Sequence, residues 1–326
     1  MPNSFAWLAY ACLALRPLPH SFNLQPAAVR QPTSQLSAPE SHASFRVRVV
    51  GQGRPLLLLA GLGCSGTVWD QTLARYARRY QCHVVSLAGF AGQAPVAGPL
   101  LATARQELLA YVAQQRLHRP ALLGHSLGGF LALELATAAP TQFSQVIVLD
   151  ALPFGAAAAQ PQLTEAQVRQ ATPSPAALGQ QFASLPAAQF AQLQRQLLIP
   201  AVADTARLRQ LLAERLSSDP AALGRATAEM LQTDLRPQLP RLAIPVLVLG
   251  SDATARLLLQ KPTASAAECR QAYAAQYAAV PHLTLEMHPT ARHFLQYDAP
   301  EWYFQQLDHV LNAPVASLSQ HPARPQ

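Results

Sequence analysis

Lysine is almost missing from this 326-residue sequence, and charged side chains of any kind are few. Charged residues make up 13% of the chain, and Lys261 is the single lysine. The net charge of +7 therefore comes from arginines, which are scattered and nowhere form a run of five basic residues. Nucleic acids and anionic membranes are usually recognised by clustered positive charge, so the sequence predicts no nucleic-acid partner.

Cysteine is also scarce, with only Cys12, Cys64, Cys82 and Cys269 in the chain. No two of them form a C-x-x-C pair, which argues against a zinc or thioredoxin-type site, and we expect no bound metal. The glycine-rich segment 61–66 lacks the lysine of a phosphate-binding P-loop, and we expect no cofactor. Cys12 lies in a leader segment, so three thiols remain in an exported form, and the sequence leaves their disulfide status open.

Apolar runs long enough to span a membrane are missing as well. The leading run, residues 5–15, is shorter than the roughly 20 residues that a membrane-spanning helix needs, but it matches the apolar core of a secretory signal. Residues 16–43 are rich in proline, serine, glutamine and alanine, as in a linker. We therefore expect residues 1–43 to be a signal segment and disordered linker, and the protein to be exported to the periplasm or secreted. Because no basic residue precedes the apolar run, a cytoplasmic location is the alternative.

What the chain does contain is a regular alternation of strand and helix patterns. Short apolar or alternating segments predict the strands, and longer amphipathic segments separate them. Such alternation predicts a mostly parallel sheet flanked by helices, with functional residues at the carboxyl ends of the strands. The predicted strands are residues 45–49, 55–60, 83–87, 120–123, 145–150, 245–250 and 283–287, and the main predicted helices are 68–80, 100–117 and 299–311.

The alternation stops between the strand that ends at Asp150 and the strand that begins at Pro245. Residues 152–236 carry only helical patterns, including a capping box that starts at Thr164 and an N-cap at Asp219. We expect this block to be a helical cap over the active edge of the sheet. The predicted core is then residues 44–151 with 237–313, and residues 314–326 form a flexible tail.

The most informative segment is Gly-His-Ser-Leu-Gly at residues 124–128. It follows an apolar strand and precedes a helix-forming run, so it is a G-x-S-x-G motif in the strand–turn–helix context that gives the motif meaning. The turn exposes the central side chain, and the following helix directs free N–H groups toward it. We therefore predict that Ser126 is a nucleophile.

A serine hydroxyl needs a base to accept its proton. His293 lies in the loop after the last predicted strand, where this chain order places the base. His288 is a rival, but it follows that strand directly. His125 adjoins the serine, yet we expect its ring to point elsewhere.

The base in turn needs a carboxylate partner. Asp150, at the tip of one strand, and Asp252, just after the next, both qualify; we favour Asp150 slightly and keep Asp252 as the alternative acid. An oxyanion hole requires two N–H donors, which we assign to Leu127, directly after the serine, and to Leu62, in the loop after the 55–60 strand.

Three segments together resemble the α/β-hydrolase superfamily: Ala-Gly-Leu-Gly at 60–63, Gly-His-Ser-Leu-Gly-Gly at 124–129, and Arg-His-Phe at 292–294. The similarity covers about residues 45–312 and is greatest to exported bacterial α/β-fold hydrolases of the carboxylesterase type with a helical lid. The resemblance implies a triad of Ser126, His293 and one of the two aspartates. Two departures, an alanine before Gly61 and the turn at 89–92, leave the substrate class open.

The leading functional hypothesis is therefore hydrolysis of an ester, or a similar acyl bond of a small molecule, through an acyl-enzyme on Ser126. An acyltransferase with the same triad and a non-catalytic binding protein of the same fold are the alternatives. An apolar acyl pocket would be lined by Phe154, Phe182, Phe190 and Met230 from the helical block, although such residues also pack helices together.

Overall fold

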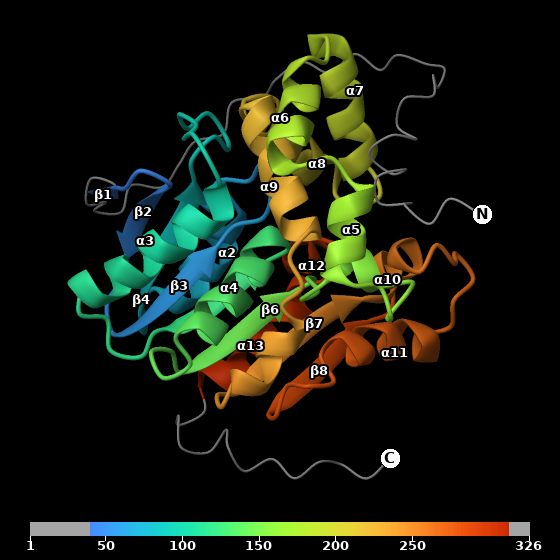
Figure 1. Ribbon diagram of the computed structural model, residues 1–326. Coiled ribbons are helices and arrows are strands. Elements are labelled where there is room, and N and C mark those ends of the chain that lie inside the picture. The colour runs from blue at the N-terminus through green and yellow to red at the C-terminus, as the bar shows by residue number, and fades with distance from the viewer. Residues whose placement is uncertain (1–39, 313–326) are drawn as a thin grey trace.

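The computed structural model describes residues 40–312, which form one eight-stranded sheet with helices on both of its faces (Figure 1). The predicted signal segment with Cys12 and the predicted C-terminal tail lie outside these residues. Of the predicted linker, only residues 40–43 lie within them. Within 40–312, no helix has the length and apolar character needed to cross a bilayer. The same part of the chain holds no cluster of three histidine, cysteine or acidic side chains arranged to bind a metal ion.

The sheet has the strand order β1-β2-β4-β3-β5-β6-β7-β8. The β1–β2 and β2–β4 pairs are antiparallel, whereas all the other pairs are parallel. The carboxyl ends of the parallel strands therefore meet at one edge. The strands are β1 (Glu40–Ser41), β2 (Phe45–Val50), β3 (Arg54–Leu59), β4 (Tyr80–Leu87), β5 (Ala121–His125), β6 (Gln145–Leu149), β7 (Val246–Ser251) and β8 (Leu283–His288).

Strand β3 shows why its sequence is continuously apolar. Leu57 and Leu59 pack into one hydrophobic cluster, while Leu56 and Leu58 pack into a second. Successive side chains of a strand point to opposite faces, so a strand covered on both sides has no polar positions. The helices that flank the sheet are α2 (Asp70–Tyr76), α3 (Leu100–Gln114), α4 (Leu127–Ala138), α10 (Asp252–Leu258), α11 (Ala266–Gln276), α12 (Leu295–Asp298) and α13 (Pro300–Leu311), with the short 3-10 helices η1 (Gly66–Trp69) and η3 (Arg236–Arg241).

The predicted mostly parallel sheet with flanking helices is confirmed. One predicted helix, residues 68–80, is wrong in its extent, because the chain forms η1 and α2 and then enters β4 at Tyr80. Tyr80 pairs with Arg54 at the start of β3. Pairing with a neighbouring strand therefore decides where β4 begins, and local helix propensity does not.

Between β6 and β7 the chain forms a helical insertion, which we define as residues 155–231. It consists of the 3-10 helix η2 (Gly155–Ala157) followed by α5 (Glu165–Ala171), α6 (Pro175–Ala183), α7 (Ala187–Leu198), α8 (Thr205–Leu216) and α9 (Pro220–Leu231). Helices α6 to α9 stand beyond the carboxyl ends of the strands (Figure 1). Two glycines allow α6 and α9 to touch: a Cβ on Gly224 would lie 2.6 Å from the Leu178 carbonyl oxygen, and one on Gly179 would lie 2.9 Å from that of Ala221.

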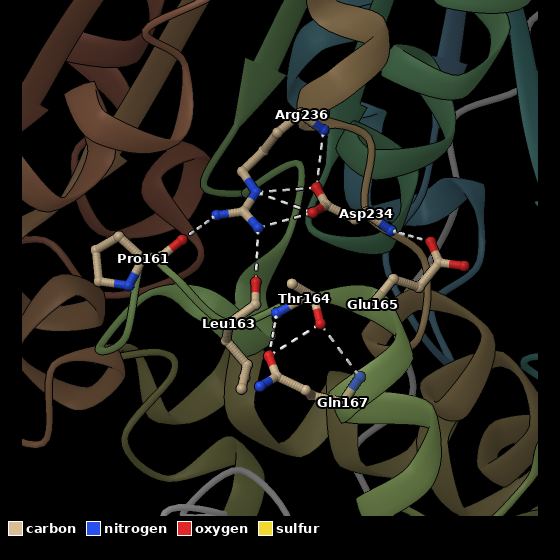
Figure 2. Close-up of polar contacts among 7 residues, drawn as sticks. All are labelled: Pro161, Leu163, Thr164, Glu165, Gln167, Asp234 and Arg236. Atoms are coloured by element: carbon tan, nitrogen blue, oxygen red, sulfur yellow. Dashed lines mark hydrogen bonds and ion pairs between the residues drawn. The ribbon is translucent and has the colours of Figure 1, made fainter.

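Polar contacts fasten the start of the insertion to the segment that directly follows it (Figure 2). The guanidinium of Arg236 forms an ion pair with Asp234 at 2.7 Å and donates to the carbonyl oxygens of Pro161 and Leu163. The backbone N–H of Asp234 donates to Glu165 at 2.8 Å. The predicted capping box from Thr164 is present beside this network (Figure 2). The predicted N-cap of Asp219 is also present, at the start of α9.

Cys64, Cys82 and Cys269 are free and buried. Burial raises the pKa of the Cys64 and Cys82 thiols to about 12. Burial raises the pKa of Cys269 as well, so all three thiols are protonated near neutral pH. They form no disulfide with one another.

Candidate active site

Ser126 lies at the sharp turn between β5 and α4. Its backbone has φ 54° and ψ −121°, a conformation that is rare for a residue with a side chain and costs roughly 1–3 kcal/mol. The turn is held because the Ser126 N–H donates to the Leu149 carbonyl at 2.9 Å and the Ser126 carbonyl accepts from Phe130 at 3.0 Å. The surrounding fold thus holds this side chain at the carboxyl edge of the sheet.

The glycines around Ser126 are required by the close approach of two backbones. A Cβ on Gly124 would lie 2.1 Å from the Gly128 carbonyl oxygen, and a Cβ on Gly128 would lie 2.0 Å from the Leu59 carbonyl oxygen. Both contacts are shorter than any side chain tolerates, and both involve backbone atoms that cannot move aside. The G-x-S-x-G spacing therefore reflects the packing of α4 against β5 and β3.

The loop after β8 brings His293 beside Asp150, at the end of β6. The imidazole Nδ1 and the Asp150 Oδ2 are 2.7 Å apart, and the carboxylate is fully shielded from solvent. Asp150 itself has a positive φ of 50°. Of the two aspartates that the sequence left open, Asp150 is the one that hydrogen-bonds the histidine.

Asp150 also accepts hydrogen bonds from three other groups. Its Oδ1 accepts from the Ser251 N–H at 2.9 Å and from the Tyr273 hydroxyl at 2.7 Å, and its Oδ2 accepts from the Thr254 hydroxyl at 2.6 Å. Burial, together with the nearby Asp150 charge, raises the pKa of Tyr273 well above its usual value, so the phenol remains a donor. With His293 included, all four hydrogen-bonding sites of the carboxylate are occupied.

Asp252 and His288 lie in other environments. Asp252 begins α10 and is 3.6 Å from the Arg256 guanidinium, while burial raises its pKa. The Nδ1 of His288 accepts from the Ala291 N–H at 2.8 Å, and its ring packs against Trp302. His288 therefore shapes the loop that carries His293.

His125 points away from the cavity, into the protein. It is completely buried, and its Nε2 lies 3.1 Å from the His293 carbonyl oxygen. Burial lowers the pKa of His125 well below 6.5, and the neighbouring His293 lowers it further, so the ring is neutral. A Cβ on Gly61 would lie 2.9 Å from the His125 Nδ1, which explains why the loop after β3 needs glycine there. His125 thus packs between the two loops that flank Ser126.

The two residues assigned to an oxyanion hole come from α4 and from the loop after β3. Leu127 is the first residue of α4, so its N–H is among the four that have no acceptor inside the helix. Leu62 lies in the loop after β3 and lines the same cavity as Ser126.

That cavity has a volume of about 490 Å³ and is bounded by the sheet edge, α10 and the helical insertion. Ser126, Asp150 and His293 line it together. Phe182 and Met230 also line it, but Phe154 and Phe190 do not; Phe154 packs with Ala157 and Val168 instead. The remaining wall residues are mostly apolar and include Leu178, Leu197, Leu198, Leu223, Leu231, Leu257 and Leu258.

The model of the alpha/beta hydrolase family matches residues 56–306, which is most of the chain and includes Ser126, Asp150, His293 and the residues that line the cavity. The protein belongs to the α/β-hydrolase family. Its curated relatives include two pimeloyl-[acyl-carrier protein] methyl ester esterases. The one from Aeromonas hydrophila subsp. hydrophila is 34% identical over 62% of this chain and 78% of its own. The one from Aeromonas salmonicida is 33% identical over 73% of this chain and 90% of its own.

Solved structures of this α/β-hydrolase fold are similar over most of the chain. A thermophilic esterase from Thermogutta terrifontis superposes with a TM-score of 0.65 at 18% identity and covers 85% of this chain and 98% of its own. An enol-lactonase from Burkholderia xenovorans gives 0.62 at 14% identity and covers 82% of this chain and 96% of its own. These likenesses establish the fold. Family membership and the esterase relatives support an enzyme that hydrolyses esters.

Some residues of this α/β-hydrolase site were not predicted from the sequence. Thr254 and Tyr273, which hydrogen-bond Asp150, come from α10 and α11, and neither sits in a motif. Arg215 of α8, which reaches the cavity from the insertion, was not predicted either. Its one signal in the sequence is the Asp-Pro pair at 219–220, which marks a turn after α8 but does not indicate the direction of the side chain.

Proposed function

We propose that this protein is a serine hydrolase that cleaves a carboxylic ester through an acyl-enzyme on Ser126. The observation that carries the proposal is the 2.7 Å hydrogen bond between His293 and Asp150, in a cavity that Ser126 also lines. A histidine with one nitrogen held by a buried carboxylate presents its other nitrogen as a base. The helical insertion acts as a cap that encloses the substrate above Ser126.

In the first half of the reaction, the Ser126 Oγ attacks the ester carbonyl carbon while the His293 Nε2 accepts the hydroxyl proton. The resulting tetrahedral intermediate collapses, the bond from carbon to the alcohol oxygen breaks, and His293 returns its proton to the leaving alcohol. In the second half, water gives a proton to His293 and attacks the acyl-enzyme. The carbon–Oγ bond then breaks, and the proton returns to Ser126 as the carboxylic acid leaves.

Asp150 and the backbone stabilise the charges that arise in these steps. Asp150 keeps the Nδ1–H of His293 oriented and stabilises the imidazolium, and its four hydrogen bonds hold the carboxylate in place. The N–H groups of Leu62 and Leu127 bind the negative oxygen of the tetrahedral intermediate. Each such donor contributes about 3 kcal/mol to transition-state stabilisation in acyl-transfer enzymes.

Methyl esters are the first substrates to test, because the curated relatives are methyl ester esterases. The apolar cavity of about 490 Å³ suits a small or medium-sized acyl chain. Hydrolysis releases an alcohol and an acid, and analysis of both products distinguishes it from acyl transfer to a second alcohol.

The test compares wild type with Ser126→Ala on p-nitrophenyl butyrate and with a fluorophosphonate probe. We expect Ser126→Ala to lose roughly 10³-fold or more in kcat and to lose covalent labelling, because the residual rate depends on binding and the oxyanion hole alone. Ser184→Ala, at an exposed position at the end of α6, is the control and should behave as wild type. Equal rates for wild type and Ser126→Ala, or labelling that persists in Ser126→Ala, would contradict the proposal.

A further inference from the structure

Arg215, in the last turn of α8, is turned into the cavity that Ser126 and His293 line. An arginine at the end of a surface helix ordinarily extends into water. Here the residue is half-buried, and its Nε is closed off from solvent without a hydrogen-bond partner. Burial lowers the pKa of Arg215, but a guanidinium remains charged in proteins, so the cavity holds a fixed positive charge.

The polar groups that contact this guanidinium are neutral, although the charge of the adjacent Glu214 acts on it without forming an ion pair. Its Nη1 donates to the side-chain oxygen of Gln194 at 3.2 Å, and its other polar neighbour is the Cys64 thiol, whose pKa of about 12 keeps it protonated. In the described part of the chain, no carboxylate lies within ion-pair distance of Arg215. The adjacent Glu214 is engaged elsewhere, since it accepts from the Ser65 N–H at 2.8 Å and from the Ser65 hydroxyl at 3.0 Å.

The other arginine that lines the cavity, Arg256, is neutralised. It faces Asp252 at 3.6 Å, and its Nε donates to the Ala264 carbonyl at 2.9 Å. Arg256 therefore serves as a matched comparison: both arginines border the same cavity, but among the described residues Arg256 forms an ion pair with an acid and Arg215 does not.

Arg215 is also close to the reacting centre. Its side chain crosses Gly63, where a Cβ would lie 2.5 Å from the Arg215 Cδ, and Gly63 directly follows Leu62 of the oxyanion loop. The charge of Arg215 contributes to lowering the pKa of His125, the neighbour of Ser126 in the chain. A substrate that reaches Ser126 therefore passes within range of this charge.

We propose that Arg215 binds a carboxylate of the substrate, so that the preferred substrates are esters that carry a free carboxylic acid, such as monoesters of dicarboxylic acids. This inference rests on the proposed function. A guanidinium next to apolar walls has lost water, and a carboxylate restores charge-assisted hydrogen bonds in a matching planar geometry. A single unpaired cation matches a singly charged anion, whereas a phosphate dianion would bring excess negative charge into an apolar cavity.

The kinetic test compares monomethyl with dimethyl esters of the diacids from succinate to suberate, so that charge is the main difference within each pair. We expect wild type to favour the monoester by roughly 10- to 100-fold in kcat/KM at the best chain length, which is the effect of one hydrogen-bonded charge. Arg215→Gln should reduce this ratio to near 1, mainly through KM, and Arg256→Gln should preserve it. The inference would be overturned if wild type showed no preference for the monoester. It would also be overturned if Arg215→Gln lowered kcat/KM equally for the monoester and the dimethyl ester, a result that would assign Arg215 to oxyanion stabilisation.

A binding measurement separates this inference from the proposed function. Free diacids are added to Ser126→Ala, which cannot form an acyl-enzyme, and binding is followed by calorimetry. We expect the diacid of the preferred length to bind Ser126→Ala at least 10-fold more tightly than the Ser126→Ala, Arg215→Gln double variant. Equal affinities would overturn the role of Arg215 even if wild type hydrolyses neutral esters. Tight binding by Ser126→Ala with no ester hydrolysis in wild type would retain the carboxylate site and refute the hydrolase.

Discussion

The Oδ2 of Asp150 and the Nδ1 of His293 are 2.7 Å apart, although 143 positions of the chain separate the two residues. Asp150 directly follows β6, and His293 lies in the loop after β8, two strands away in the sheet. The helical insertion occupies much of the chain between them. The parallel sheet, which aligns the ends of its strands at one edge, is what brings the two side chains together.

Asp150→Asn is expected to lower kcat by roughly 10³- to 10⁴-fold, because an amide cannot hold the imidazole in the required tautomer or stabilise its charge. Asp252→Asn is the matched control, since Asp252 faces Arg256 and not His293. Steady-state kinetics on p-nitrophenyl butyrate, with the melting temperature of each variant, checks the prediction. A larger loss of kcat in Asp252→Asn than in Asp150→Asn would assign the acid to Asp252.

Gly128→Ala is expected to destabilise the fold by about 3 kcal/mol or more, because the new Cβ would lie 2.0 Å from the Leu59 carbonyl oxygen. Gly155→Ala is the control, since a Cβ at Gly155 meets nothing within 4 Å and should change the free energy of unfolding by less than about 0.5 kcal/mol. Urea denaturation followed by circular dichroism measures both. Similar stabilities for the two variants would refute the close approach of α4 and β3.

Arg236→Ala is expected to cost about 3 kcal/mol of stability, because it removes a partly buried ion pair and leaves Asp234 and two carbonyl groups without their donors. Arg169→Ala removes a more exposed pair with Glu165 on α5, and we expect a loss of at most about 0.5 kcal/mol. Chemical denaturation of the two variants tests the difference. If Arg236→Ala lowered the free energy of unfolding no more than Arg169→Ala does, the contacts in Figure 2 would contribute little to fastening the insertion.

Acid should destabilise the protein partly through His83, a buried ring whose Nδ1 is 2.7 Å from the Tyr111 hydroxyl. Burial lowers its pKa from 6.5 to about 4, so between these pH values the unfolded chain binds more protons than the folded chain. The free energy of unfolding therefore decreases as the pH falls from 6.5 toward 4, by on the order of 3 kcal/mol for this one group.

Melting temperatures between pH 4 and pH 7 test this prediction. His83→Gln should flatten the dependence on pH in that range, whereas His118→Gln, at an exposed position, should leave it as in wild type. If His83→Gln and wild type lost stability in parallel as the pH falls, other groups would account for the acid sensitivity.

Much of the sheet and part of the candidate site could be predicted from local sequence. Ser126 stands in a G-x-S-x-G motif between a strand pattern and a helix pattern, and the contact that requires Gly124 is with Gly128 of the same motif, so a short window contains most of the needed information. The choice between Asp150 and Asp252 could not be settled in this way. Both follow adjacent strands, and the positive φ that accompanies the placement of Asp150 is a property of the folded backbone.

The residues that surround the site were harder to predict because they come from distant elements. Tyr273 reaches Asp150 only through the packing of α11 against the sheet edge, and nothing near Tyr273 in the sequence marks it. Arg215 resembles any other arginine at a helix end, and its inward direction follows from how α8 packs over Gly63. The spacing of apolar residues in the sequence predicts which helices and strands form, but contacts between distant helices and strands decide which side chains meet.

The contacts that join Arg236 and Asp234 to residues 161–165 have an evolutionary consequence. Because the chain leaves the sheet and returns to it at this fastened junction, changes within the insertion need not alter the ends of β6 and β7, provided that the hydrogen bonds that join Glu214 and Glu229 to the core are kept. The helices of the insertion can lengthen, shorten or acquire new side chains while the strands below keep their register. Selectivity, including any charge that Arg215 presents, can therefore diverge among relatives without rebuilding the chemistry beneath it.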